Sequence, residues 1–309
     1  MDHTLHSNPH GARRTALVLG GGGSTGNAWL IGVVAGLFAA GLDVADADLT
    51  VGTSAGSTAA AQLAGATPAE LFADILRGTP ARPGAPAGAT TGRPSNRPVV
   101  DHLARTRQII DSSDGPADLR RAMGAAALER AAGSDGSWQT QWRATVASRF
   151  AGHTWPQRTV LITAVEAETG EPVVFDRSSG VDLADAVAAS CSSGLPYAIG
   201  ERHYIDGGYR TNAENADLAT GFDRVLVLSP FGGRSLAPAR WGTHLAAQVE
   251  ALRDTGSTVT TISPRSDDEQ LFGVNAMDGS LRPAAARAGY DQGEEIAPRL
   301  ADGWRPAAG

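Results

Sequence analysis

Residues 15–56 run TALVLGGGGSTGNAWLIGVVAGLFAAGLDVADADLTVGTSAG and contain two strand–turn–helix patterns in succession. In the first pattern, the apolar run Thr15–Leu19 leads through four glycines toward Ala28–Ala40, a segment that is apolar on almost every side. In the second, the short run Asp48–Val51 leads into the glycine-flanked turn Gly52–Gly56. Because a strand that passes through a turn into a buried helix is the repeating unit of α/β folds, we predict a mainly parallel sheet covered by helices.

The remainder of the chain continues the alternation of helices and strands. The expected helices are Ser57–Ala64, Val99–Ile110, Pro116–Ala132, Trp138–Phe150, Asp182–Ser190, a helix within 239–252, and Pro283–Leu300. The expected strands are Arg158–Glu166, Pro172–Phe175, a run just before Asp206, Arg224–Leu228 and Thr258–Ile262. We therefore expect one domain over residues 15–305, preceded by a mobile tail at residues 1–14. Residues 79–97 are rich in Pro, Gly and Ala and predict a mobile loop, either a plain surface insertion or a lid over a functional site.

The bulk properties fit a globular protein and exclude some partners. Of the 309 residues, 42% are apolar and 19% are charged, which is enough apolar material for a sizeable core. The formal net charge of -7 argues against a nucleic-acid partner, because phosphate contacts need clustered Lys and Arg. The single cysteine, Cys191, excludes an intrachain disulfide. No stretch has the apolar character of a secretion signal or a membrane span. We therefore expect a cytoplasmic protein without a transmembrane segment. Transient contact with a membrane surface is compatible with this expectation.

The pentapeptide Gly52-Thr53-Ser54-Ala55-Gly56 matches the GxSxG pattern of a serine nucleophile. The flanking positions are glycine because larger side chains in such a strand-to-helix turn would clash with neighbouring backbone. The turn exposes the Ser54 hydroxyl at a helix N-terminus, where the helix dipole favours developing negative charge. Since small residues recur by chance in this Ala- and Gly-rich chain, the pentapeptide alone is also compatible with a purely structural turn.

The glycine-rich stretch Gly20–Gly26 allows two interpretations. Gly21, Gly23 and Gly26 match the GxGxxG fingerprint of dinucleotide-binding proteins, which also requires an acidic residue at the end of the next strand. Here the three aspartates of residues 43–48 precede that strand, and the GxSxG turn occupies its end. Alternatively, successive glycines direct backbone N–H groups into one cavity, where they stabilise a tetrahedral oxyanion. Only this second interpretation uses both glycine motifs, and a dinucleotide-binding oxidoreductase remains the alternative.

A third motif, Asp206-Gly207-Gly208, follows a predicted strand and supplies a candidate base. A serine–acid–histidine triad in the usual α/β-hydrolase order needs a histidine after the acid. Of the seven histidines only His244 lies late enough, and its surroundings predict a residue on a helix. The early position of Ser54, at the second strand, also departs from that fold. Both points favour Asp206 acting directly as the base for Ser54.

Taken together, these motifs resemble those of the patatin-like phospholipase family. The resemblance covers about residues 15–300 and rests on GGGSTG (Gly21–Gly26), GTSAG and DGG in the family's order, with further similarity in the small-residue run Ala188–Pro196 and in Asn212. The family implies a three-layer α/β/α fold with a mainly parallel central sheet, and a Ser54–Asp206 catalytic dyad. It also implies oxyanion-hole N–H groups from Gly21, Gly22 and Gly23; the remaining motif glycines are Gly26, Gly52, Gly56, Gly207 and Gly208.

The implied function is hydrolysis of a carboxylic ester in a lipid or other acyl-ester substrate, in the manner of a phospholipase A or esterase. Neither a metal ion nor an organic cofactor is expected. One position departs from the family, which usually has Arg or Lys two residues after the glycine triplet, where this chain has Thr25. The absence of that cation weakens the expectation of a phospholipid head group while leaving ester hydrolysis in place. A non-catalytic protein that keeps the patatin fold is the second alternative.

Overall fold

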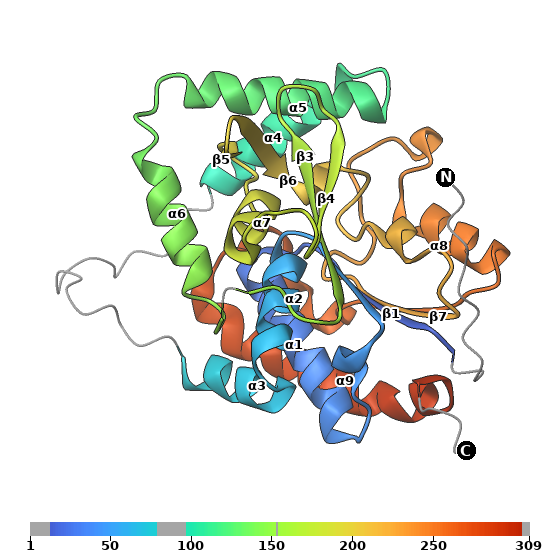
Figure 1. The fold of residues 1–309 in the computed structure, drawn as a ribbon. Helices are drawn as coiled ribbons and strands as arrows, with labels where there is room; N and C mark the ends of the chain where they lie inside the picture. The colour runs from blue at the N-terminus through green and yellow to red at the C-terminus, as the bar shows by residue number, and fades with distance from the viewer. Residues whose placement is uncertain (1–12, 79–96, 153, 305–309) are drawn as a thin grey trace.

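The computed structural model describes residues 13–78, 97–152 and 154–304 (Figure 1). Residues 1–12 of the expected tail lie outside these ranges, and so does the expected loop at 79–97 except for its last residue. The described residues form an eight-stranded sheet with helices on both faces.

The sheet has the order β5-β6-β3-β2-β1-β7-β8, and β4 pairs separately with β3. The strands are β1 (Thr15–Leu19), β2 (Leu49–Gly52), β3 (Thr159–Glu166), β4 (Pro172–Phe175), β5 (Tyr197–Ile199), β6 (Arg202–Asp206), β7 (Arg224–Leu228) and β8 (Thr258–Ile262). The five strands from β3 to β8 in this order run parallel, whereas β4 and β6 are antiparallel to β3, and β5 is antiparallel to β6. The predicted mainly parallel sheet is confirmed.

Nine α-helices occur in the described ranges: α1 (Gly23–Ala39), α2 (Ala55–Gly65), α3 (Pro68–Arg77), α4 (Arg97–Asp111), α5 (Pro116–Ala131), α6 (Ser137–Ala147), α7 (Leu183–Ser190), α8 (Leu245–Asp254) and α9 (Arg282–Trp304). The first begins at Gly23, five residues earlier than the apolar run alone predicts. The sequence analysis missed α3, although Thr67 and Glu70 form a reciprocal capping box at its start. Helix α8 begins only at Leu245, after a short 3₁₀ turn. Across the part of the chain with described structure, no helix is both long and apolar enough to cross a membrane.

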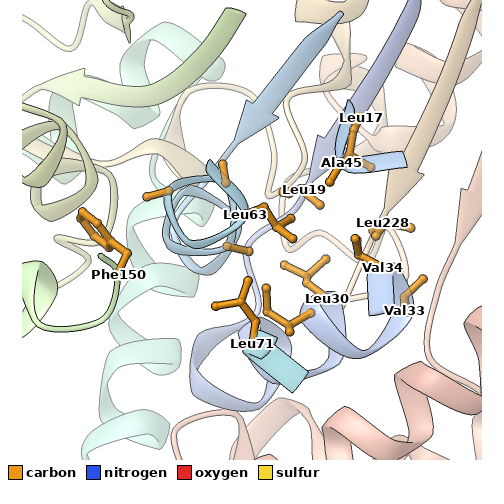
Figure 2. Packing of buried hydrophobic residues seen from close by; sticks show 14 of the residues in the cluster. Leu17, Leu19, Leu30, Val33, Val34, Ala45, Leu63, Leu71, Phe150 and Leu228 are labelled. Carbon is orange, nitrogen blue, oxygen red and sulfur yellow. The ribbon is translucent and has the colours of Figure 1, made fainter. Parts of the chain in front are cut away.

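The sheet separates two apolar layers, and alternate residues of β1 show this division. Leu17 and Leu19 face a large cluster that includes α1, α2, α7 and α9, whereas Ala16 and Val18 face a cluster with α8. This alternation follows from the two-residue period of a strand. Figure 2 shows Leu17 next to Ala45, and Leu19 on the side toward Leu30 and Val34 of α1, within the same cluster. The expected three-layer α/β/α architecture is therefore confirmed.

Helices α1 and α9 pack along each other in the layer below the sheet (Figure 1). Glycines face the partner helix on both sides: Gly32 and Gly36 on α1, and Gly289 and Gly293 on α9. A Cβ added at Gly32 would collide with the carbonyl oxygen of Ala286, and each of the other three glycines would meet the opposite backbone in the same way. These four positions let the two helix backbones come into direct contact.

The register of the sheet brings two distant segments together at one edge. Gly52, at the end of β2, pairs with Ile162 of β3, and Ala164, two residues further along β3, pairs with Asp206 at the end of β6. Because β6 is antiparallel to β3, its last residue approaches the carboxyl end of β2. The serine turn after β2 and the acid after β6 thus become neighbours.

Candidate active site

Ser54 occupies the strained turn between β2 and α2. Its backbone has φ 53 and ψ -113, a combination that non-glycine residues rarely adopt. The flanking glycines are needed for space, because a Cβ at Gly56 would collide with the Leu19 carbonyl and one at Gly52 would lie 2.7 Å from the Ser57 Cα. The turn therefore has the geometry expected for GxSxG.

The Ser54 hydroxyl contacts the predicted acid directly. Ser54 Oγ donates a hydrogen bond to Asp206 Oδ2 at 2.9 Å, and the Gly208 N–H donates to the other carboxylate oxygen at 2.8 Å. The Asp206 side chain is buried. Burial raises the pKa of Asp206 to about 6, although the hydrogen bonds from Gly208 and Ser54 act in the opposite direction. A carboxylate with this pKa is ionised at neutral pH yet more basic than an exposed aspartate.

The peptide groups of Ser54 are held by side chains from α7 and α2. The Ser54 N–H donates to Ser190 Oγ at 2.9 Å. The Ser54 carbonyl accepts hydrogen bonds from Ser57 Oγ at 2.6 Å and from Cys191 Sγ at 3.1 Å. Burial raises the pKa of the Cys191 thiol, so it stays protonated and able to donate. The run Ala188–Pro196 was singled out from the sequence, but these contacts to the serine turn were not foreseen.

A buried polar network links the serine turn to the acid loop. Asn215 Nδ2 donates to Thr53 Oγ1 and to the Gly207 carbonyl, both at 3.0 Å, and lies 3.4 Å from Thr163 Oγ1. Thr53 Oγ1 and Thr163 Oγ1 are themselves 2.9 Å apart. One amide therefore joins the residue before Ser54 to the residue after the acid. Asn215 itself has a left-handed backbone with φ 55, which asparagine tolerates better than most residues. The sequence analysis missed it.

The glycine loop passes beside Ser54. A Cβ added at Gly21 would lie 3.6 Å from the Ser54 Cβ, so this glycine leaves the serine accessible. The Gly21 N–H is already used, because it donates to the Ala213 carbonyl at 2.8 Å. Gly22 is the N-cap of α1 and Gly23 its first residue, and within the described ranges neither N–H forms a hydrogen bond. In the described residues, the N–H groups of Gly22 and Gly23 are therefore not used by a protein acceptor, whereas that of Gly21 is.

Comparison with known families assigns the chain to one of them. A family model described as Patatin-like phospholipase matches residues 17–219. The chain belongs to this family. The predicted family is thus confirmed, and membership supports lipid hydrolysis as the class of activity.

Two solved structures resemble this patatin-like chain. VipD from Legionella pneumophila is 12% identical, with 93% of this chain and 67% of that chain covered and a TM-score of 0.42. The type III effector protein ExoU is 16% identical, with 93% and 53% covered and a TM-score of 0.38, so the present chain spans about half of its length. A search of curated proteins finds no match.

The other residues named from the sequence have structural contacts of their own in the patatin-like domain. Gly26 closes the first turn of α1 by donating to the Gly22 carbonyl at 3.0 Å. A Cβ at Gly207 would collide with Thr163, which explains that glycine by space. His244 is the N-cap of α8, and its Nε2 lies 2.7 Å from the Ala237 carbonyl oxygen. Among the residues with described structure, no group of three or more His, Cys, Asp or Glu is placed to hold a metal ion.

Proposed function

We propose that this protein is a serine lipid acyl hydrolase in which Ser54 is the nucleophile and Asp206 is the general base. The observation that carries the proposal is the 2.9 Å hydrogen bond from Ser54 Oγ to a buried carboxylate, formed at a strained GxSxG turn. We assign residues 15–305 to one catalytic domain. The substrate class is carboxylic esters of lipids, with transient membrane-surface contact during substrate uptake.

In the acylation step, Ser54 Oγ attacks the carbonyl carbon of the ester while its proton passes to Asp206. The resulting oxyanion accepts hydrogen bonds from the N–H groups of Gly22 and Gly23, and the N-terminus of α1 adds its positive end. Collapse of the tetrahedral intermediate breaks the bond to the alcohol oxygen. The departing alkoxide takes the proton from Asp206, which leaves an acyl group on Ser54.

Deacylation repeats these steps with water. Asp206 accepts a proton from water as the oxygen attacks the acyl carbonyl, and the same two N–H groups stabilise the second oxyanion. When this intermediate collapses, the Ser54 oxygen leaves and recovers the proton from Asp206. The fatty acid is released, and both side chains return to their starting protonation states.

The pKa of Asp206 gives the proposal a pH signature. Because the base must be ionised, kcat/KM for an ester substrate is expected to rise with pH through about 6 and then reach a plateau. A stopped-assay pH profile with a p-nitrophenyl ester measures this rise. A rate that is independent of pH between 5 and 8 would contradict the assignment of Asp206 as base.

Fluorophosphonate labelling tests the nucleophile. The wild-type protein should be labelled and Ser54→Ala should not, while the control Ser148→Ala, an exposed serine after α6, should be labelled normally. Asp206→Asn should keep the fold and lose p-nitrophenyl ester turnover. Labelling that persists in Ser54→Ala, or near-normal turnover by Asp206→Asn, would reject the dyad.

The same experiment separates the two alternatives. A dinucleotide-binding oxidoreductase using Gly21–Gly26 predicts a copurifying nucleotide and no labelling of Ser54. A non-catalytic patatin-fold binding protein predicts no turnover of any ester. The proximity of Gly21 to Ser54 favours the hydrolase, because the glycine loop and the serine then serve one reaction.

A further inference from the structure

The segment 276–282, which precedes and enters α9, is fastened to the first turn of α1. The Ala276 carbonyl accepts a hydrogen bond from the Thr25 N–H at 3.0 Å. At the other end, Arg282 Nη1 donates to the Ser24 carbonyl at 2.7 Å, and Nη2 donates to Asn27 Oδ1 at 3.0 Å. This segment lies beyond residues 17–219, so the family match does not include it.

The segment 276–282 also lies against the glycine loop beside the dyad. A Cβ added at Gly23 would lie 2.8 Å from the Ala276 carbonyl oxygen and 3.0 Å from Met277 Sδ. Two residues earlier in the loop, a Cβ added at Gly21 would lie 3.6 Å from the Ser54 Cβ. Because two residues span at most about 7 Å, these contacts place Met277 within about 14 Å of Ser54, a distance that a long acyl chain can cover.

Met277 is the most exposed of the large apolar side chains in the described ranges, with 65% of its surface accessible. A single exposed apolar side chain needs no explanation by itself. The location of Met277 does need an explanation, because this side chain lies against Gly23 of the glycine loop. The residue before it, Ala276, provides the carbonyl that fastens the segment to α1. An unbranched thioether adapts its shape to flexible apolar ligands, and a lipid ester brings such a chain to this site.

Thr25 fits the same arrangement. Its side chain is fully buried, and its hydroxyl lies 3.5 Å from the Ala276 carbonyl oxygen. The segment 276–282 therefore packs against the position where the family usually has an Arg or Lys. Arg282 brings a guanidinium to the same turn of α1 from the other end of the chain.

We propose that the segment 276–282 forms a wall of the substrate site and that Met277 contacts the acyl chain of the bound ester. The proposal rests on the hydrolase function above and deepens it, because it selects esters whose acyl chain is long enough to pass Ser54 and reach Met277. The alcohol part of the ester does not contact this wall. Arg282 acts as a positioning residue that holds the segment on α1.

Kinetics with p-nitrophenyl acetate, octanoate and dodecanoate test the contact, because only the acyl chain varies. Met277→Ala should lower kcat/KM about tenfold for the two long esters and leave the acetate unchanged, as expected for a lost apolar contact. The control is Phe38→Ala, which removes a side chain that is 36% exposed. Phe38 lies at the opposite end of α1 from Gly23, about 22 Å away along the helix at 1.5 Å per residue. An unchanged chain-length profile in Met277→Ala would overturn the proposal. So would a loss that instead follows alcohol length in a series of alkyl acetates.

A binding measurement separates failure of this wall from failure of the hydrolase function. Dodecanoate is titrated by calorimetry into Ser54→Ala and into Ser54→Ala combined with Met277→Ala, and the second protein should bind about tenfold more weakly. If this difference appears but the wild type hydrolyses no ester, the wall stands and the hydrolase proposal fails. Equal affinities overturn the wall, whatever the turnover of the wild type.

Discussion

The serine turn and the α1–α9 helix pair use small residues for opposite purposes. At the turn, Ser54 has a left-handed φ, and a carboxylate is buried beside it with a raised pKa. The only other non-glycine residue with positive φ in the described ranges is Asn215, which belongs to the same site. In the helix pair, by contrast, the contact glycines have no left-handed φ, and they bring the two backbones into direct contact.

This difference suggests how free energy is distributed over the molecule. The serine turn holds a strained backbone and a desolvated charge, each of which costs free energy. The helix pair has no such cost, and its close contact contributes packing over much of α1 and α9. We therefore expect removal of the buried charge at Asp206 to abolish activity while stabilising the fold. Substitutions in the helix pair should lower stability and affect activity only through unfolding.

The largest effect is expected for Gly32→Leu. A side chain there would collide with the Ala286 carbonyl and force the two helices apart. We expect a loss of about 4 kcal/mol in the free energy of unfolding, at the upper end for overpacking, or no folded protein at all. Urea unfolding followed by circular dichroism measures it. The control Gly133→Leu, at a glycine with no atom near the added Cβ, should be close to neutral; equal losses in both variants would contradict the role of close contact.

A smaller effect of opposite sign is expected for Asp206→Asn. The carboxyl has a pKa of about 6 in the folded state and 3.8 in the reference state, so the folded protein binds this proton more tightly. Well below pH 4 the carboxyl is therefore neutral in both states and costs nothing, whereas its ionisation destabilises the fold increasingly as the pH rises from 4 through 6. At pH 8 the neutral asparagine should remove up to about 3 kcal/mol of this penalty.

Melting temperatures between pH 4 and 8 check the sign of this prediction. The advantage of Asp206→Asn over the wild type should be a few degrees at pH 8 and should shrink toward zero near pH 4. The control is the exposed Ser148→Ala, which changes no charged group, so its difference from the wild type should be the same at both pH values. A wild type that is more stable than Asp206→Asn at pH 8 would reverse the argument about buried charge.

Local sequence signals predicted the serine side of this comparison well. β1 was predicted with its observed bounds, and the turn around Ser54 was located, because an apolar run and glycines are sufficient local signals. The acid motif at Asp206 was also found, yet its approach to Ser54 depends on the antiparallel pairing of β6 with β3, which no local pattern encodes. The close contact of α1 with α9 was not predicted, because it joins segments about 250 residues apart.

The supporting contacts of the site were the least predictable part. Asn215 and Ser190 make their bonds to the serine turn across 162 and 136 residues of sequence. A polar residue of either kind in a turn or at a helix end is usually explained by local hydrogen bonds. Even the capping box of α3, a local signal, was overlooked in an Ala-rich stretch. The engaged N–H of Gly21 shows that a motif gives the residues of a loop, but not which of their groups are free.

Asn215→Gly tests the network between the two loops. Glycine keeps the left-handed φ available, so the variant removes the amide without adding backbone strain. Buried oxygens of Thr53 and Gly207 then lose their donor, which should cost about 2 kcal/mol in unfolding free energy. Because the dyad is less well positioned, kcat should fall about tenfold while KM changes little. Unchanged kcat with reduced stability would make the network structural only.

The smallest effect is the expected difference in unfolding free energy between Ser54→Gly and Ser54→Ala. This difference reports the backbone strain at position 54 separately from the catalytic chemistry. Both variants lack the nucleophile, so neither should turn over ester. The strain free energy of φ 53 and ψ -113 applies to alanine and not to glycine. We expect it to exceed the larger entropic cost of ordering a glycine on folding. Ser54→Gly should therefore be more stable than Ser54→Ala by about 1 kcal/mol in urea unfolding. At Ser148, whose φ of -70 is ordinary, the order should reverse, with the alanine variant more stable. If the glycine variant were the less stable one at both positions, the turn would store no strain. The serine turn would then differ from the helix pair only in its buried charge.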